Sequence, residues 1–334
     1  MKQRFLHYIY RVAYYSGLIA LCYFTNRHKR RVLTYHNIIP DELLDDSLHL
    51  RTSHSSSAFD AQLEIISKRW PDSERQLDPD GSGCLITFDD GYCNQARIAA
   101  PILEKWNRYA IFFLTTDLIA NGNLLWPDRL LFWVSYVPFG RYRLAKMEFD
   151  LTADEQRPTF WSQIWRQIIQ NQNSIKPIAD AMEISYPFEA LQIDPKLHEL
   201  RFFPLSATEL SNLQDAGHLL GGHSYGHGIL ARLDDQTVKE DFTRCLQLSE
   251  DMFNCSYYSY PFGGSDEVSR REQNLCRMSG FTRSFLNVDQ VPSKLQADHY
   301  GIPRTTLSNT TNRFILEAEL SGFKELLKKW AGKN

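Results

Sequence analysis

Two pairs of residues in this sequence could act together in chemistry: the adjacent carboxylates Asp89 and Asp90, and the histidines His223 and His227. Two like charges so close repel each other, which raises the pKa of one of them unless a cation lies between them. The histidines are four residues apart, so they would share a face on a helical turn, and imidazole is a common ligand of divalent metals. One carboxylate and two imidazoles make a three-ligand site with open positions, the arrangement of catalytic metals.

Each pair taken alone also has a structural explanation. Asp89-Asp90-Gly91 could be a turn that caps the following helix, and two histidines at this spacing are more often surface or core residues than ligands. Glycines at positions 221, 222, 226 and 228 would let the backbone around the histidines bend tightly and bring the rings together. The case for a shared site therefore depends on the elements that carry the two pairs.

Short apolar segments precede both pairs and predict buried strands. Segments 84–88 and 110–114 are continuous apolar runs of the kind found in parallel sheets, and a helical stripe of apolar residues lies between them. Further strands are predicted over 32–35, 219–220, 257–260 and 281–286. Repeated strand–helix units with functional residues at the strand ends indicate an α/β protein whose sheet is a (β/α) barrel, distorted or incomplete.

Two regions lie outside this rhythm. Residues 117–203 contain four tryptophans and several prolines without strand-like alternation, which predicts a helical insertion in the main domain of residues 31–334. Packing is the simpler role for this insertion, and a wall that faces substrate is the alternative. Residues 1–30 are predicted as a membrane-interfacial or amphipathic helix, with peripheral membrane contact through the apolar, tyrosine-rich residues 5–24; a buried helix of the main domain is the competing interpretation.

Composition excludes some functions and leaves others open. A formal net charge of −3 gives no general attraction to nucleic acid, and the short basic run at residues 27–31 is interpreted as a solvated or membrane-facing patch. Six scattered cysteines without a C-x-x-C pair favour a reducing compartment and argue against a disulfide framework. No small-x-small cleavage site follows the N-terminal apolar segment, so we expect a membrane-associated or cytoplasmic protein rather than a secreted one.

Three segments resemble the first three motifs of the polysaccharide deacetylase family (the NodB-homology domain, carbohydrate esterase family 4). They are Thr87-Phe88-Asp89-Asp90-Gly91, His223-Ser224-x-x-His227 and Tyr260-Pro261-Phe262-Gly263. The resemblance covers residues 31–115 and 204–310 and leaves the insertion outside. It implies that Asp90, His223 and His227 hold one divalent metal, zinc first, with cobalt, nickel or iron as alternatives. It further implies that Asp89 is the catalytic base and that the backbone N–H of Phe262 holds the oxyanion.

The sequence departs from the family pattern at two places. The third motif usually begins with an arginine that braces the base, but Ser259 stands there; Arg304 could supply the missing guanidinium, or it could be a surface residue. The usual C-terminal Leu-x-His is absent, because no histidine follows His299. Instead, Leu33-Thr34-Tyr35-His36-Asn37 resembles the N-terminal histidine motif of the poly-N-acetylglucosamine deacetylase subgroup, which makes His36 the candidate general acid.

These observations lead to one predicted function and two alternatives. The predicted function is a metal-dependent hydrolase that acts on carbon–nitrogen bonds other than peptide bonds. It would remove N-acetyl groups from an N-acetylhexosamine polysaccharide or oligosaccharide, as in exopolysaccharide synthesis, and release acetate. The first alternative is a deacylase of a lipid-linked sugar or a non-sugar amide, and the second is a non-catalytic carbohydrate-binding relative. The expected partner is an N-acetylated glycan, and no nucleic acid partner is expected.

Overall fold

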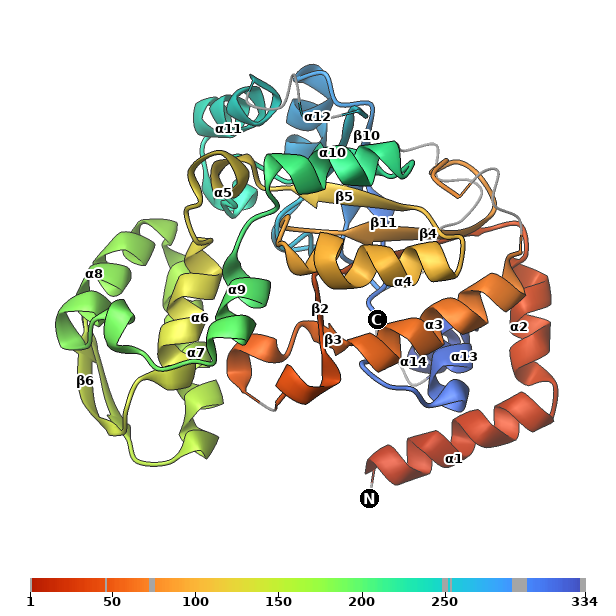
Figure 1. Cartoon of the computed structure of the whole chain (residues 1–334), viewed down its shortest axis with the longest axis horizontal. Coiled ribbons are helices and arrows are strands. Elements are labelled where there is room, and N and C mark those ends of the chain that lie inside the picture. Colours follow the sequence, from red (N-terminus) through yellow and green to blue (C-terminus); the bar gives the residue numbers. More distant parts are fainter. Residues whose placement is uncertain are drawn as a thin grey trace.

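A curved sheet of seven parallel strands forms the centre of the protein (Figure 1). The computed structural model describes residues 2–45, 47–71, 76–247, 252, 254–289 and 299–330. In spatial order the strands are β1 (Arg30–Tyr35), β4 (Gly83–Phe88), β5 (Ala110–Leu114), β8 (Leu219–Gly222), β9 (Tyr257–Ser259), β10 (Arg283–Leu286) and β11 (Ile302–Pro303). Beyond β11, a parallel bridge joins Thr305 to Leu33 of β1. The sheet is thus a nearly closed barrel, which confirms the predicted distorted (β/α) barrel.

Alternate residues of the strands fill two separate cores. Side chains such as Leu85, Ile111 and Phe113 pack with one another inside the barrel. Their neighbours Ile86, Phe88 and Phe112 point the other way and are buried beneath the surrounding helices. Because successive side chains of a strand alternate in direction, an unbroken apolar run is needed wherever both faces are covered. This requirement explains why these strands could be recognised in the sequence.

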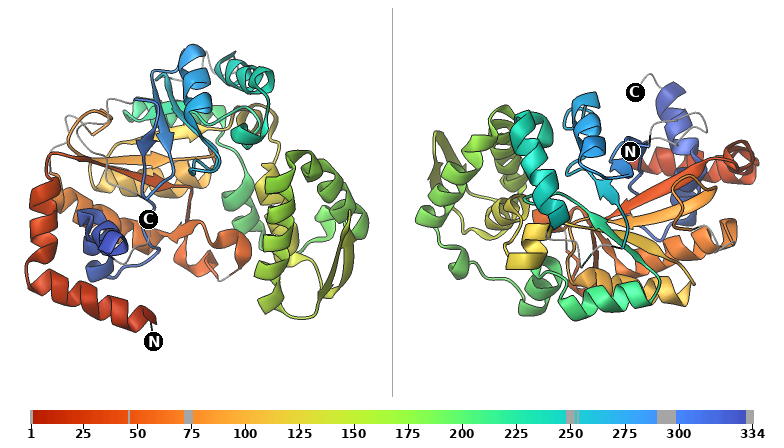
Figure 2. Two further views of the ribbon diagram at one scale, coloured as in Figure 1. Left: turned by 180° about the vertical axis from the view of Figure 1, so that it is seen from behind. Right: turned by 90° about the horizontal axis from the view of Figure 1, so that it is seen from above.

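Helices surround the barrel (Figures 1 and 2). The bounds are α3 (Ser56–Arg69), α4 (Ala100–Lys105), α10 (Ala207–Asp215), α11 (Asp235–Gln247), α12 (Arg270–Met278), α13 (Arg313–Ser321) and α14 (Phe323–Trp330). The π-helical turn η3 (Gln95–Ala99) precedes α4, and the short strands β2 (Asn37–Ile39) and β3 (Ser53–Ser55) pair outside the barrel. At the start of α10, Ser206 and Glu209 form a reciprocal capping box that satisfies two free backbone donors.

The insertion is a separate layer on one side of the barrel. It comprises α5 (Thr116–Asn121), α6 (Trp126–Tyr136), α7 (Arg157–Gln170), α8 (Ile175–Ser185), α9 (Pro195–Phe202) and the hairpin β6 (Gly140–Leu144) and β7 (Met147–Leu151). It has a hydrophobic core of its own, in which Trp133, Phe160 and Ile164 are buried. The views in Figure 2 place it at the end of the molecule opposite α1 and α2.

The hairpin differs from the purely helical insertion predicted from the sequence. Its two-residue turn, Ala145-Lys146, has none of the glycine or asparagine residues that usually mark such turns, although Ala145 has a positive φ of 52°. Its cross-strand partners include exposed ion pairs, such as Arg143 with Glu148. Along both strands the charged residues alternate with apolar ones that face the core of the insertion, such as Leu144, Phe149 and Leu151, so the strand pattern was present and the prediction missed it.

The N-terminal segment forms two helices rather than the single predicted one. Helices α1 (Lys2–Tyr15) and α2 (Leu18–Asn26) meet at Gly17, whose φ of 83° breaks the helical path. Their inner face packs against α13 and α14, where Tyr10 and Ile19 contact the same cluster as Phe323. Within the part of the chain that the structure describes, no helix is long and apolar enough to cross a membrane.

The basic run at residues 27–31 is only partly the solvated patch that the sequence suggested. Arg27 is exposed, but Arg30 and Arg31 belong to β1 and are buried. Arg31 forms an ion pair with Glu325 at 2.9 Å. The last part of the run therefore stabilises the fold instead of facing solvent.

Candidate active site

The predicted site residues all follow the carboxyl ends of barrel strands. Because the strands are parallel, these ends lie at the same edge of the barrel, where catalytic residues of (β/α) barrels gather. The residues follow five different strands: His36 after β1, Asp89 and Asp90 after β4, His223 and His227 after β8, Phe262 after β9, and Arg304 after β11. The structure thus brings together residues from positions 36 to 304.

Asp90, His223 and His227 form a buried cluster that could hold one metal ion. A ligand atom from each lies within 4.8 Å of the other two. The Nε2 atoms of His223 and His227 lie 3.5 and 3.3 Å from Oδ1 of Asp90. Two ligands at about 2.0–2.1 Å from a tetrahedral ion are themselves about 3.3–3.4 Å apart, so this spacing fits a shared cation.

The hydrogen bonds around the cluster leave its donor atoms available to a cation. Nδ1 of His223 lies 2.8 Å from the carbonyl oxygen of Ser259. A carbonyl can only accept, so Nδ1 carries the proton and the lone pair of Nε2 faces Asp90. No described residue makes a hydrogen bond of good geometry to the buried Oδ1 of Asp90. A buried carboxylate oxygen without a hydrogen bond is costly, which favours a bound cation at this point.

The two histidines meet in an irregular loop and not on the helical turn that the sequence suggested. Their ring centroids are 5.1 Å apart. Asp241 of α11 accepts hydrogen bonds from the Ser224 hydroxyl (2.9 Å) and the backbone N–H of Tyr225 (3.2 Å), while the N–H of His227 donates to Ser224 Oγ (3.0 Å). The helix behind the loop therefore determines how the histidines approach each other.

The glycines near the histidines have a different role from the one predicted. None of the four has a positive φ; the left-handed positions are Ser224 (72°) and His227 (56°). At Gly221, an added Cβ would lie 2.7 Å from the carbonyl oxygen of Tyr257. This glycine is needed because β8 and β9 approach closely, and the turn itself depends on strained non-glycine residues, each costing about 1–3 kcal/mol.

Asp89 lies beside this cluster in a fully buried ion pair with Arg304. The two terminal nitrogens of Arg304 donate to Oδ1 and Oδ2 of Asp89 at 2.7 and 2.6 Å. The same guanidinium donates to Ser259 Oγ (2.7 Å), and this hydroxyl lies 3.2 Å from Oδ2 of Asp89. The arginine that is missing at position 259 is thus replaced by Arg304, which follows β11 and reaches Asp89 from far along the chain. Arg304 is not a surface residue.

The charges in the site keep both carboxyl groups ionised. Burial raises the pKa of Asp89, but the charge and hydrogen bonds of Arg304 outweigh it and hold the pKa below its usual range. Burial likewise raises the pKa of Asp90, and the nearby imidazoles of His223 and His227 lower it well below the usual range. An ionised Asp89 is available as a proton acceptor, and an ionised Asp90 is available to a cation.

His36 and Phe262 border the same site. His36 is half-buried directly after β1, its carbonyl oxygen accepts from Gln95 (2.9 Å), and it lies level with Asp89 because Tyr35 pairs with Phe88 in the sheet. Phe262 has a positive φ of 62°, and its ring packs on that of His227 at 5.0 Å between centroids. Phe262 thus contacts the cluster directly, and His36 lies at the neighbouring strand end beside Asp89.

Sequence reasoning missed two residues that hold the site in place. Asp241 lies three residues after the buried Val238, on a helix face that also contains Phe242, and an acidic residue on an apolar face is a signal of a buried partner. Trp126 donates from its indole nitrogen to the carbonyl oxygen of His227 at 2.9 Å. It lies in the insertion, and no sequence pattern linked it to the metal motif.

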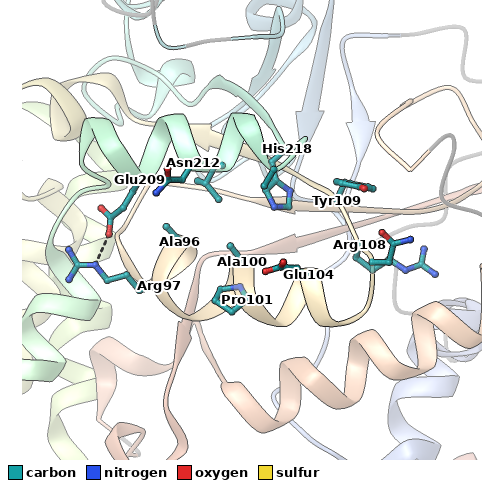
Figure 3. Close-up of a pocket in the computed structure, with 13 residues that line it drawn as sticks. Ala96, Arg97, Ala100, Pro101, Glu104, Arg108, Tyr109, Glu209, Asn212 and His218 are labelled. Atoms are coloured by element: carbon teal, nitrogen blue, oxygen red, sulfur yellow. Dashed lines mark hydrogen bonds and ion pairs between the residues drawn. The ribbon is translucent and has the colours of Figure 1, made fainter.

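A groove of about 480 Å³ lies elsewhere, between α4 and α10 (Figure 3). Ala100 and Pro101 line one side, and Asn212 and His218 the other, while an ion pair between Arg97 and Glu209 closes one end. The groove contains none of the predicted site residues, because it lies in the helix layer outside the barrel. It is not part of the candidate active site.

Comparison of the fold with solved structures gives several similar deacetylases. They include the Streptococcus pyogenes deacetylase PplD in complex with acetate (13% identity, 84% of this chain and 93% of that chain, TM-score 0.50). A de-N-acetylase from Aggregatibacter actinomycetemcomitans (12%, 87% and 99%, TM-score 0.53) and IcaB from Ammonifex degensii (16%, 88% and 97%, TM-score 0.50) are also similar. At these identities the likeness establishes the fold alone. No curated protein shows significant sequence similarity to the chain.

The family is established by a different comparison. The family model for polysaccharide deacetylase matches residues 77–280, more than half of the chain. The match includes the Asp89-Asp90 motif, both histidines and Phe262, so the resemblance predicted from the sequence is confirmed. This protein belongs to the polysaccharide deacetylase family, hydrolases that act on carbon–nitrogen bonds other than peptide bonds in acetylated glycans.

Proposed function

We propose that this protein is a metal-dependent hydrolase that removes N-acetyl groups from an N-acetylhexosamine-containing polysaccharide or oligosaccharide and releases acetate. One observation carries the proposal: the buried donor cluster of Asp90, His223 and His227 lies beside an ionised carboxylate, Asp89, that is not part of the cluster. Amide hydrolysis requires such a division, because one group must bind the cation while another accepts the proton of the attacking water.

The proposed reaction assigns a role to each residue. A divalent ion held by Asp90, His223 and His227 would supply Lewis acidity toward water and the acetyl carbonyl. Asp89 accepts a proton as water attacks the carbonyl carbon, and Arg304 orients its carboxylate.

Two further groups complete the reaction. The N–H of Phe262 donates to the oxygen on which negative charge develops. His36 donates a proton to the nitrogen, so that the carbon–nitrogen bond breaks to give acetate and a free amine, because an amide anion is a very poor leaving group.

The donor set favours a transition metal. Two imidazole nitrogens and one carboxylate oxygen suit zinc, cobalt, nickel or iron, whereas magnesium and calcium prefer oxygen ligands. The test is to deplete the protein of metal with a chelator and measure acetate and free amine from a panel of N-acetylated glycans. Stoichiometric Zn²⁺, Co²⁺, Ni²⁺ or Fe²⁺ is then added back.

We expect activity to be lost on depletion and restored by at least one of these ions at about one per chain. Acetate release that survives complete metal removal would contradict the metal dependence. Metal-loaded protein that releases acetate from none of the glycans would contradict the proposed substrate, and lipid-linked sugars and non-sugar amides then become the next substrates to test.

We also propose that α1 and α2 contact an anionic lipid surface. Seven of the twelve large hydrophobic side chains that the structure shows as exposed lie on these two helices or between them: Leu6, Tyr8, Val12, Tyr15, Leu18, Leu21 and Phe24. Arg11 and Arg27 are exposed beside them, and no acidic residue occurs before Asp41. An apolar face flanked by positive charge complements the interface of an anionic membrane.

Vesicle binding tests this second proposal. We expect the protein to sediment with vesicles of phosphatidylglycerol and phosphatidylcholine, and less with phosphatidylcholine alone or at high salt. Leu21→Asp should lower the partition coefficient about tenfold or more, since it removes one buried leucine from the contact. Ile184→Asp, at another exposed apolar residue, is the matched control. Equal binding by both variants would refute the proposed surface and leave the deacetylase proposal intact.

A further inference from the structure

Four aromatic side chains form a continuous surface that begins at the cluster of Asp90, His223 and His227. We call Trp126, Trp161, Trp165 and Phe262 the aromatic wall; each of them is partly exposed. Trp165 lies 5.2 Å from Phe262 and 6.1 Å from Trp126 between ring centroids, and the two indole planes differ by only 11°. Trp161, one helical turn before Trp165 on α7, continues the surface at 5.9 Å.

The aromatic wall contacts His227 of this cluster at two points. Phe262 packs its ring on His227, and Trp126 donates from its indole nitrogen to the carbonyl oxygen of His227. When the acetyl group of a substrate reaches the cluster, the aromatic wall therefore lies on one side of the reacting sugar. The wall is therefore placed to contact what lies beside the reacting sugar.

The insertion that carries the three tryptophans of the aromatic wall is fixed to the loop that contains Asp89 and Asp90. Tyr92, two residues after Asp90, donates its hydroxyl to Asp128 of α6, and Asp128 pairs with the buried Arg201 of α9 at 2.6 Å. Arg201 also lies over the Tyr92 ring, with 5.2 Å between its guanidinium carbon and the ring centroid. The insertion is thus fixed to the Asp89-Asp90 loop through the hydroxyl and ring of Tyr92, which contact a buried ion pair inside the insertion. A preorganised surface of this kind loses little entropy when a ligand binds.

Packing against the core of the insertion accounts for only part of the surface of the wall residues. The buried face of α7 consists of Phe160, Ile164 and Ile168, and Trp161 and Trp165 lie beside it with part of their surface in solvent. The indole N–H groups of Trp126 and Trp133 both donate to backbone carbonyls. Within the described residues, those of Trp161 and Trp165 donate to no acceptor and remain available to a ligand.

We propose that the aromatic wall is a binding subsite for an uncharged sugar residue next to the one being deacetylated. A pyranose ring presents a face of C–H groups surrounded by hydroxyls, which matches a flat apolar ring with a free N–H at its edge. None of the four side chains of the wall is charged, so the chemistry favours a neutral hexosamine chain. This inference rests on the proposed deacetylase function and adds that the substrate is an oligomer rather than a single sugar.

The test compares a long and a short substrate in the metal-loaded enzyme. Trp165→Ala should raise KM and lower kcat/KM for the N-acetylglucosamine pentamer by about tenfold or more, because an aromatic contact is lost. Hydrolysis of 4-nitrophenyl acetate, which needs only the metal centre, should change by less than about twofold. Trp165→Phe should recover most of the loss. The control, Trp330→Ala, removes an exposed tryptophan on α14 and should leave both substrates unaffected.

Two results would overturn the inference while the deacetylase function stands. One is an unchanged kcat/KM for the pentamer in Trp165→Ala. The other is an equal loss on pentamer and ester, which would mean that Trp165 only supports the metal centre. If the wild-type protein deacetylates no glycan, pentamer binding followed by tryptophan fluorescence decides: binding that is lost in Trp165→Ala supports the subsite, and no binding by the wild type refutes it.

Discussion

Replacing Arg304 with methionine should reveal how much of the stability depends on the buried Asp89 pair. The guanidinium is fully buried and donates to both carboxylate oxygens, as well as to Thr87 and Ser259. Methionine fills much of the same space but leaves the buried carboxylate without its counter-charge. Breaking a buried ion pair from one side costs about 3–5 kcal/mol, so we expect the free energy of unfolding at pH 7 to fall by about this amount.

The loss in Arg304→Met should shrink as the pH falls. In the wild type the pKa of Asp89 is lowered, so its contribution to stability is present above the unfolded-state pKa of about 3.9 and is lost as the pH falls through the folded-state value. Without Arg304, no guanidinium offsets the effect of burial, so the pKa of Asp89 rises. In the variant, Asp89 then takes up a proton on mild acidification, so the loss in free energy of unfolding becomes smaller between pH 7 and about pH 4.

Urea unfolding of metal-depleted protein measures this difference without a contribution from metal binding. Asp89→Asn and the double variant complete a mutant cycle, in which the double variant should regain most of the stability lost by Arg304→Met. Arg143→Met, which breaks an exposed pair with Glu148, is the control and should stay within about 0.5 kcal/mol of the wild type. A loss below about 1 kcal/mol in Arg304→Met, or one independent of pH, would refute the reasoning.

Four further substitutions test the proposed roles. His227→Ala should remove most of the bound metal while the fold persists, and unchanged metal by elemental analysis would exclude it as a ligand. Asp89→Asn should retain metal but lower kcat by about 10²–10⁴, whereas a near-normal kcat would place the base elsewhere. Asp241→Asn should weaken metal binding about 10–100-fold through the loop it holds, measured by chelator competition; equal affinity would contradict this. His36→Gln should slow release from an amide far more than from 4-nitrophenyl acetate, whose leaving group needs no proton, and equal losses would argue against a general acid.

The sequence alone was sufficient for the barrel and for the residues of the cluster. Strands buried on both faces must be continuous apolar runs, so segments such as 84–88 and 110–114 could be read directly. The two carboxylates are adjacent and the two histidines four residues apart, so each pair is a local pattern. Each pair could be recognised because its members are close in the sequence, although the way in which the two histidines approach each other depends on Asp241.

Only the tertiary structure decided which distant residues complete the site. Arg304 reaches Asp89 because a parallel bridge between Thr305 and Leu33 brings the end of the chain back beside β1. Asp241 supports the histidine loop from a helix, and nothing in its sequence neighbourhood specifies that contact. Such pairs depend on barrel closure, a property of all the strands together and of no single segment.

The same limit explains the insertion and the N-terminal helices. The sequence contains tryptophans in the insertion whose contacts could not be predicted. The fold places Trp126 and Trp165 against Phe262 beside the cluster. The sequence also showed an apolar N-terminal segment, and the fold divides that segment into a face packed on α13 and a face left in solvent. Residue type determines that a side chain favours burial, but only the three-dimensional arrangement of the other elements determines which surface covers it.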